Sequence, residues 1–171
     1  APTPPLESLR TILCMAVTTD LWMKDGDNGT GEDRVQVSVI DISRAYFNAH
    51  PKEDDPVFVE LPPEDPDYGK GFCGRLNVYM YGTRKAADGW HCEYSDSLGE
   101  IDFDIGQSSA CVFVHKKRCI ATSVHGDDFT TVGRKKDLDW FKASLSRKYE
   151  LKETARLGPD PSDDKEVRIL N

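Results

Sequence analysis

The chain has 171 residues, of which 38% are hydrophobic and 30% charged, and its formal net charge is −8. This length suits one domain or most of one, and the acidic balance argues against unaided binding to nucleic acid, which depends on Lys and Arg. The five cysteines form no C-x-x-C pair, so neither a disulfide framework nor a zinc knuckle is indicated. No apolar run approaches the ~20 residues that span a bilayer. No signal segment opens the chain, so we expect a soluble, intracellular protein without a membrane partner.

The first third of the chain predicts a helix, a loop and a strand. Apolar residues recur at helical spacing and predict a core helix over residues 5–17. Residues 25–33 have the composition of an exposed loop, and their acidic spacing does not fit a calcium-binding loop. Valine then alternates with other residues from Val35 onward, which predicts a half-buried strand that ends at Asp41.

The middle of the chain predicts a short turn, two strands and a helix. Residues 43–49 fit a short helix or turn, and residues 57–61 and 72–81 fit strands separated by a Pro-rich segment. Gly82 allows a backbone to approach a ligand closely. Apolar residues then repeat every four positions around Trp90, which predicts a helix with one buried stripe that includes this tryptophan.

A hairpin with two carboxylates at its tip is the most informative feature of the last third. A strand at residues 110–115 leads to apolar runs at 119–124 and 129–132, which flank His125-Gly126-Asp127-Asp128. Adjacent carboxylates repel each other unless water, a cationic side chain or a metal ion offsets the charge, and a solvated turn is the simplest interpretation. If the strand ending at Asp41 pairs beside this hairpin, three carboxylates converge on a site suited to Mg²⁺ or Mn²⁺.

The chain closes with a predicted amphipathic helix over residues 138–149 and a strand over residues 165–170. The order of elements predicts an α+β fold, a palm-like antiparallel sheet with helices packed on one face. Basic residues concentrate at 116–118, 134–136 and 147–148. These clusters either contact phosphate or are solvated ends of turns and helices, and the sequence leaves both interpretations open.

Three segments in order give the chain its resemblance to a known family. Residues 41–49 (D-I-S-R-A-Y-F-N-A), 79–90 (Y-M-Y-G-T-R-K-A-A-D-G-W) and 125–128 (H-G-D-D) are similar to the motifs of the reverse transcriptase domain of Ty1/copia-type retrotransposons. This resemblance implies a polymerase palm and template-directed phosphoryl transfer with two Mg²⁺ or Mn²⁺ ions. It also implies primer–template RNA or DNA, deoxynucleoside triphosphates and other parts of the Pol polyprotein as partners, and a cytoplasmic or particle-associated location.

The resemblance assigns roles to individual residues. Asp41 and Asp127 are expected to bridge the metal ions, with Asp128 as a third, more peripheral carboxylate and metal ligand. His125 and Gly126 are expected to lie on the primer side of the hairpin. The ring of Tyr46 is expected to close the sugar pocket, backbone N–H groups from Ser43 onward to face the triphosphate, and the Ile42 carbonyl oxygen to add a metal ligand. The expected nucleotide-binding residues are Ile42, Ser43, Arg44, Ala45, Tyr46, Gly82 and Lys85.

The sequence departs from the family pattern at several of these positions. Lys85 stands where the family usually has Gln, Ala87 replaces a Pro, and His125 and Gly126 replace Tyr and Val. Two alternatives therefore stay open. One is a degenerate copy that folds without polymerising, and the other is an unrelated palm-fold nucleotidyl transferase or cyclase.

The resemblance also predicts the extent of the domain. Residues 1–171 are expected to form a partial reverse transcriptase domain, with the palm and a fingers-proximal region at about residues 50–80. The upstream fingers, the thumb and ribonuclease H are expected to be absent. We therefore expect this chain alone to polymerise weakly or not at all, and to bind nucleic acid weakly and in a salt-sensitive manner.

Overall fold

A computed structural model describes residues 4–18 and 33–169 of the chain. The predicted loop at residues 25–33 lies outside the described residues except for Asp33. The elements in chain order are α1 (Leu6–Met15), β1 (Val35–Ile42), the 3-10 helix η3 (Ala45–Asn48), β2 (Phe58–Glu60), β3 (Cys73–Arg75), α2 (Ala86–Gly99), β4 (Asp104–Ile105), β5 (Val112–His115), β6 (Ile120–His125), β7 (Asp128–Arg134), α3 (Lys135–Leu145) and β8 (Leu151–Leu157).

Six strands of the described chain form one antiparallel sheet in the order β4-β5-β6-β7-β1-β8. The predicted α+β class with a palm-like antiparallel sheet is therefore confirmed. Strand β1 lies inside the sheet, between β7 and β8, and nearly all of its residues are buried. Its polar residues Gln36 and Ser38 are buried too, and their side chains donate hydrogen bonds to Asp163 and Glu153. None of the helices in the described part is long and apolar enough to cross a bilayer.

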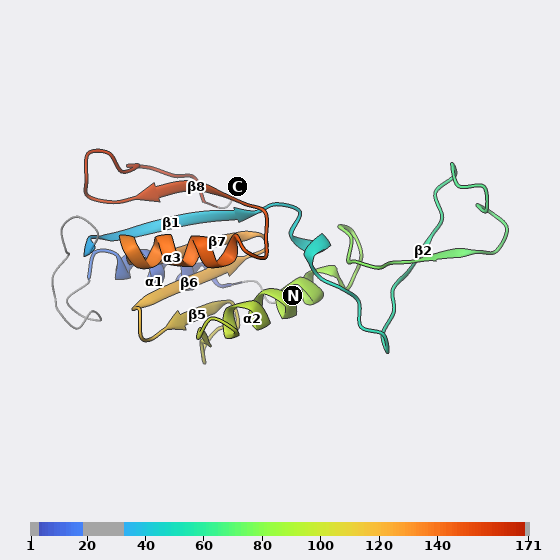
Figure 1. The fold of residues 1–171 in the computed structure, drawn as a ribbon, viewed down its shortest axis with the longest axis horizontal. Coiled ribbons are helices and arrows are strands. Elements are labelled where there is room, and N and C mark those ends of the chain that lie inside the picture. Colours follow the sequence, from blue (N-terminus) through green and yellow to red (C-terminus); the bar gives the residue numbers. More distant parts are fainter. Residues whose placement is uncertain (1–3, 19–32, 170–171) are drawn as a thin grey trace.

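The two faces of the sheet carry different helices, and Figure 1 shows α3 in front of the sheet with α1 behind it. Helices α2 and α3 pack on the face that includes Ile40, Val124 and Phe129, in a core that contains the predicted Trp90 stripe. Helix α1 packs through Ile12 on the opposite face, against residues such as Val37. The predicted palm face is therefore covered by α2 and α3, and α1 adds a helix on the other side.

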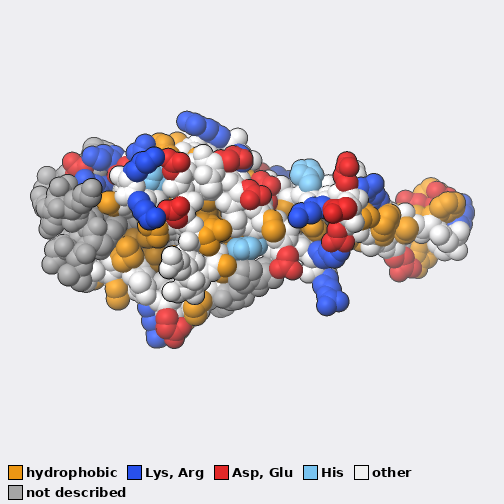
Figure 2. All heavy atoms as spheres, turned by 90° about the horizontal axis from the view of Figure 1, so that it is seen from below, with side chains coloured by type: hydrophobic (Ala, Val, Ile, Leu, Met, Phe, Trp, Pro, Cys, Tyr) orange, Lys and Arg blue, Asp and Glu red, His pale blue; other side chains and the backbone are white. Residues whose placement is uncertain are grey.

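An arm projects from the sheet between η3 and α2 (Figure 1). It consists of the β2–β3 pair and its loops, and these strands are shorter than the segments predicted at 57–61 and 72–81. The arm closes at its base, where the Tyr79 N–H donates a 2.8 Å hydrogen bond to the Ala49 carbonyl oxygen. Hydrophobic side chains are exposed on its surface, as Figure 2 shows, among them Phe58 and Phe72 at 56% and 65% exposure.

The strand predicted at residues 165–170 is wrong for its described part, since residues 165–169 form no strand. The last strand of the sheet is instead β8, which the sequence analysis did not predict. Charged residues occupy nearly half of β8, so its hydrophobic alternation is weak. Such a sequence is compatible with a strand at the edge of a sheet, where charged side chains are common.

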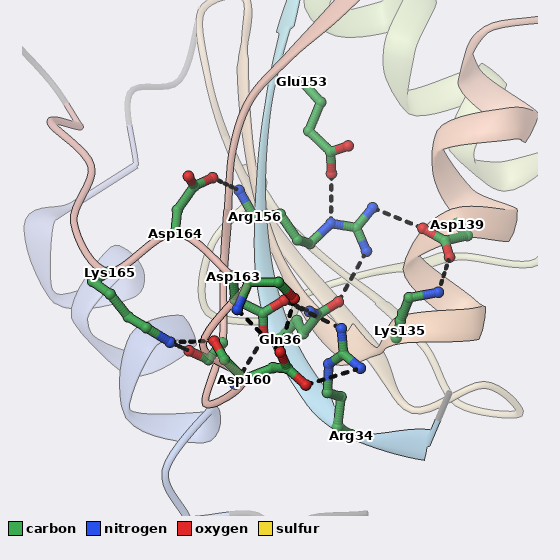
Figure 3. A network of polar contacts seen from close by, with 12 residues as sticks. Arg34, Gln36, Lys135, Asp139, Glu153, Arg156, Asp160, Asp163, Asp164 and Lys165 are labelled. Atoms are coloured by element: carbon green, nitrogen blue, oxygen red, sulfur yellow. Dashed lines mark hydrogen bonds and ion pairs between the residues drawn. The ribbon is translucent and has the colours of Figure 1, made fainter. Parts of the chain in front are cut away.

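A polar network compensates for these charges and fixes β8 beside β1 (Figure 3). The Arg156 guanidinium donates hydrogen bonds to Glu153 at 2.6 Å and to Asp139 of α3 at 3.0 Å. The Glu153 carboxylate also accepts from the Ser38 hydroxyl at 2.6 Å and from Lys142 at 2.8 Å. One carboxylate therefore joins β1, β8 and α3.

Candidate active site

The tip of the β6–β7 hairpin is a two-residue turn. His125 and Asp128 are the last paired residues, and Gly126 and Asp127 lie between them. Gly126 has a φ of 63°, a conformation that glycine adopts without steric cost. Glycine at the first central position is typical of tight hairpin turns. The departure from the family at this position is therefore compatible with the hairpin.

Strand β1 brings Asp41 to this turn. Asp41 is the cross-strand partner of Asp128, and the Ile42 N–H donates a 3.0 Å hydrogen bond to the Asp127 carbonyl oxygen. Paired residues of an antiparallel ladder project on the same face of a sheet. The carboxylates of Asp41 and Asp128 therefore lie on one face, and Asp127 lies at the adjoining tip. The predicted pairing of the Asp41 strand with the hairpin is confirmed.

Two of the carboxylates, those of Asp41 and Asp128, have raised pKa values, and the charge of Asp127 contributes to both increases. Burial raises the pKa of Asp41, the Asp127 carboxylate raises it further, and Lys152 opposes both effects. Burial also raises the pKa of Asp128, as do the charges of Asp127 and Asp41. Each additional negative charge is unfavourable here, so a cation at this end of the sheet would be favoured.

The arrangement supplies hard oxygen donors but no completed cluster. Within residues 4–18 and 33–169, no group of three or more His, Cys, Asp and Glu side chains is arranged to hold a metal ion. Asp128 lies beside His125 in a small depression that also includes Pro5 and Leu6 at the start of α1. Carboxylate oxygens are the donors that Mg²⁺ and Mn²⁺ prefer. Asp41, Asp127 and Asp128 therefore supply the right kind of ligand at this end of the sheet, and Asp128 also faces the start of α1.

The backbone after β1 is largely engaged with the chain itself. The Ser43 N–H donates to the Glu150 carbonyl oxygen at 2.9 Å, and the exposed Arg44 side chain pairs with the Glu150 carboxylate at 2.8 Å. Arg44 has a φ of 53°, a left-handed conformation. Ser43 and Arg44 line a cavity of about 360 Å³ together with Phe47 and Glu150. This cavity is the nearest space to the expected triphosphate-facing backbone.

Three aromatic rings lie together beside η3. The Tyr46 ring centroid is 4.4 Å from that of Tyr81, and the Phe47 centroid is 5.7 Å from Tyr81. Tyr46 is partly buried and packs against the core, whereas Phe47 is 42% exposed. Burial raises the pKa of Tyr81, and the negative charge of Asp127 adds to this effect. This aromatic group therefore lies within electrostatic reach of the hairpin tip.

The remaining nucleotide candidates lie before α2. Gly82 has a φ of 84° and open space around its α-carbon. Lys85 forms an ion pair with Asp55 of the arm, and both side chains are exposed. Ala45, in contrast, is fully buried. The structure thus brings Asp41, Asp127 and Asp128 together, and holds Lys85 against the arm.

Comparison with known proteins agrees with the geometry at the hairpin. The model of the family described as "Reverse transcriptase (RNA-dependent DNA polymerase)" matches residues 29–159, which is most of the chain. This chain belongs to the reverse transcriptase family. A search of curated proteins found no match. The matched reverse transcriptase region runs from before β1 to the residues after β8 and includes all three carboxylates.

Two residues near the reverse transcriptase carboxylates were missed from the sequence. Lys152 of β8 is the cross-strand partner of Asp41, and its charge opposes the rise in the pKa of Asp41. Tyr81 contacts Tyr46 and is affected by the Asp127 charge. Sequence reasoning had no signal for Lys152 because β8 itself was not predicted. Tyr81 lies inside the second motif, and its aromatic ring next to Gly82 was the sequence feature that could have identified it as a site residue.

Proposed function

We propose that this reverse transcriptase domain is the palm of a Ty1/copia-type RNA-directed DNA polymerase that transfers nucleotidyl groups with two metal ions. The observation that carries the proposal is the pairing of Asp41 with the Asp127–Asp128 turn in a chain of this family. Residues 50–80, which include the arm, are proposed as its fingers-proximal region.

The three carboxylates have different roles in this proposal. Asp41 and Asp127 hold the metal ions, the Ile42 carbonyl oxygen adds a ligand, and Asp128 is the more peripheral carboxylate. Two Mg²⁺ or Mn²⁺ ions, when bound, favour ionisation of the primer 3′-hydroxyl and stabilise the departing pyrophosphate. Lys152 limits the proton affinity of Asp41. Lys152 therefore offsets part of the unfavourable effect of burial and of Asp127 on the ionised form of Asp41.

The substrates occupy the two sides of the hairpin tip. His125 and Gly126 face the primer terminus, and Tyr46 lies under the sugar of the incoming deoxynucleoside triphosphate. Ser43, Arg44 and Ala45 line the approach of the triphosphate, with Gly82 and Lys85 before α2 beside the base pair. Ion pairs of Arg44 with Glu150 and of Lys85 with Asp55 are exposed, so their exchange for phosphate contacts costs little.

Primer extension tests the proposal. We expect any extension of a DNA primer on an RNA template by the purified chain to be weak, to require Mg²⁺ or Mn²⁺ and to be abolished by Asp127→Asn. Asp54→Asn is the matched control, because it removes an exposed carboxylate of the arm. A folded wild-type chain that binds neither the metal ion nor an RNA–DNA hybrid would favour a degenerate copy. Extension that survives Asp127→Asn would reject the assigned site.

A further inference from the structure

Two basic clusters that are far apart in the sequence meet at one end of the sheet. The turn between β5 and β6 carries residues 116–118, and the end of β7 with the first turn of α3 carries residues 134–136. β6 and β7 are antiparallel neighbours, so these clusters lie at the end of the hairpin opposite Asp127. The six steps from Asp128 to Arg134 along β7 span ~20 Å at ~3.3 Å per residue.

A cavity of about 720 Å³ lies between these clusters, and Lys and Arg outnumber Asp and Glu in its lining. We call it the basic cavity. The basic residues that line it are Lys116, Lys117, Arg118, Arg134 and Lys136, and the acidic ones are Glu100, Asp102 and Asp137. Two further carboxylates lie close by, because Asp104 pairs with Lys116 and Asp33 with Lys136. The positive charge of the cavity is therefore held largely in ion pairs, and a phosphate would have to replace the carboxylates of these pairs.

Arg118 is held in a fixed orientation at this cavity. Its Nη1 donates a 2.8 Å hydrogen bond to Asp137, which is almost fully buried, and its guanidinium carbon lies 4.0 Å from the centre of the Trp140 ring. Trp140 is held in turn by an edge contact with the buried His115 ring. The guanidinium has further donors beyond Nη1, and a planar fork of this kind suits the oxygens of a phosphate.

The lysines supply charge that is free to rearrange. Lys116 pairs with Asp104 and Lys117 with Asp102, both at 2.9 Å, and all four side chains are more than half exposed. Exposed pairs of this kind contribute ~0–1 kcal/mol each, so a phosphate group competes with them readily. Helix α3 also begins here without a side-chain cap, and its positive end favours an anion.

We propose that the basic cavity binds phosphate groups of a nucleic-acid backbone, as a contact separate from the catalytic end of the sheet. The cavity is lined by Asp137 and Trp140 of α3, on the sheet face that α2 and α3 cover, whereas Asp128 faces α1 at the other end of β7. The contact is therefore separate from the carboxylates both in its position along β7 and in the face of the sheet that it uses. The contact requires neither metal ions nor catalysis, so it stands even if the chain does not polymerise.

Fluorescence anisotropy with a labelled RNA–DNA hybrid tests this site. The double substitution Lys116→Gln and Lys117→Gln is expected to weaken binding several-fold. It is also expected to reduce the slope of log affinity against log salt by about 1.4–1.8, the value for two lost phosphate contacts. The matched control is Arg147→Gln with Arg168→Gln, which removes two exposed charges elsewhere. Equal affinity and salt slope in wild type and the lysine variant would overturn the proposal.

Two further experiments test whether the cavity binds free phosphate or nucleic acid, and what Arg118 contributes to binding. Inorganic phosphate is added to the wild type and to the lysine variant in thermal unfolding. If it stabilises only the wild type while hybrid binding is equal in both, the cavity is a free-phosphate site and the nucleic-acid assignment is wrong.

Arg118→Lys keeps the positive charge but loses the planar fork of the guanidinium group, and we expect its affinity for the hybrid to lie between those of the wild type and the lysine variant. When Asp127→Asn is also present, Lys116→Gln with Lys117→Gln is still expected to lower the affinity for the hybrid. This result would distinguish the basic cavity from the catalytic site.

Discussion

The indole Nε1–H of Trp90 donates a 2.8 Å hydrogen bond to the carbonyl oxygen of Gly126. Trp90 lies in α2 and is almost fully buried, whereas Gly126 lies at the exposed hairpin tip. A helix of the core therefore holds the turn that presents Asp127. The bond links the packing of α2 directly to the geometry of the carboxylates.

Replacing Trp90 with Phe removes this hydrogen bond while an aromatic ring remains in the core. We expect a loss of about 1–3 kcal/mol in the free energy of unfolding, because the Gly126 carbonyl loses a partner in a partly buried position. Stabilisation by Mn²⁺ is also expected to decrease, measured as the shift of the thermal midpoint. Trp140→Phe is the control. A similar loss of the Mn²⁺ shift in both variants would argue against a specific role for Trp90.

The stability of the metal-free chain should depend on Asp128. Because its pKa is raised above the ordinary value of 3.8, protonation favours the folded state. That contribution is fully present below pH 3.8 and is lost as the pH rises through the raised pKa. We therefore expect Asp128→Asn to be more stable than wild type at pH 7 in chelator, with little difference at pH 3. Urea unfolding at both pH values measures this, and an equal difference at both would contradict it.

Tyr46→Val tests the sugar pocket. The lost contact with Tyr81 is expected to reduce stability by about 0.5–1.5 kcal/mol, as is typical of an aromatic pair. Given extension by the wild type, the variant should incorporate ribonucleotides more readily, because the smaller side chain leaves room for a 2′-hydroxyl. Phe47→Val is the matched control beside the same Tyr81 ring. Reduced stability with unchanged sugar selection would show that Tyr46 serves only the core.

Glu153→Gln probes the network that joins β8 to β1 and α3. Burial alone would raise the pKa of Glu153, but hydrogen bonds from Arg156, Lys142 and Ser38 outweigh it and lower the pKa. The carboxylate therefore stabilises the fold above its ordinary pKa of 4.5, and this contribution is lost as the pH falls through the lowered value. We expect the free energy of unfolding of the variant to be lower than that of the wild type at pH 7, and this difference to decrease as the pH falls. Glu64→Gln, an exposed change on the arm, should show no gap at either pH.

Gly89 of α2 leaves space for the arm. A β-carbon at this position would overlap the ring of Tyr79, which is buried at the base of the arm. Gly89→Ala is therefore expected to destabilise the chain, although this change in a helix ordinarily stabilises by about 0.5–1 kcal/mol. Gly99→Ala in the same helix meets open space and should be neutral or stabilising. Thermal unfolding of both variants decides, and stabilisation by Gly89→Ala would contradict this packing.

Local patterns in the sequence predicted the elements that position the carboxylates. The repeat around Trp90 and the valine alternation before Asp41 indicate burial on one face of a helix or strand, and both elements are present. The prediction of a half-buried strand was wrong, because Gln36 and Ser38 on the other face of β1 are buried as well. The Gly126-Asp127 turn followed from backbone preference. These features depend on neighbours in the sequence, so the sequence alone was sufficient for them.

Features that depend on distant partners escaped prediction. β8 is stabilised by contacts of Glu153 and Arg156 with residues of β1 and α3, and its own sequence lacks a clear alternation. Lys152 was missed for the same reason. The register that sets Asp41 opposite Asp128 also depends on the pairing of β1 with β7, which are distant in the sequence. Local patterns allowed this pairing but did not predict it. The proximity of the two basic clusters likewise depends on the pairing of β6 with β7 and could not be predicted from local patterns.

Because a hydrogen bond joins Tyr79 to Ala49, the packing of the palm does not depend on the length of the arm between these two residues. The chain leaves the palm at Ala49 and returns beside it at Tyr79, so the arm is an excursion that starts and ends at one place. Lengthening such an excursion costs only about 0.6 kcal/mol for each doubling of its residues. Insertions and deletions at the outer end of the arm can therefore accumulate without displacing Asp41 or the hairpin. Related chains can accordingly diverge in the reach of this arm while they retain the same catalytic end.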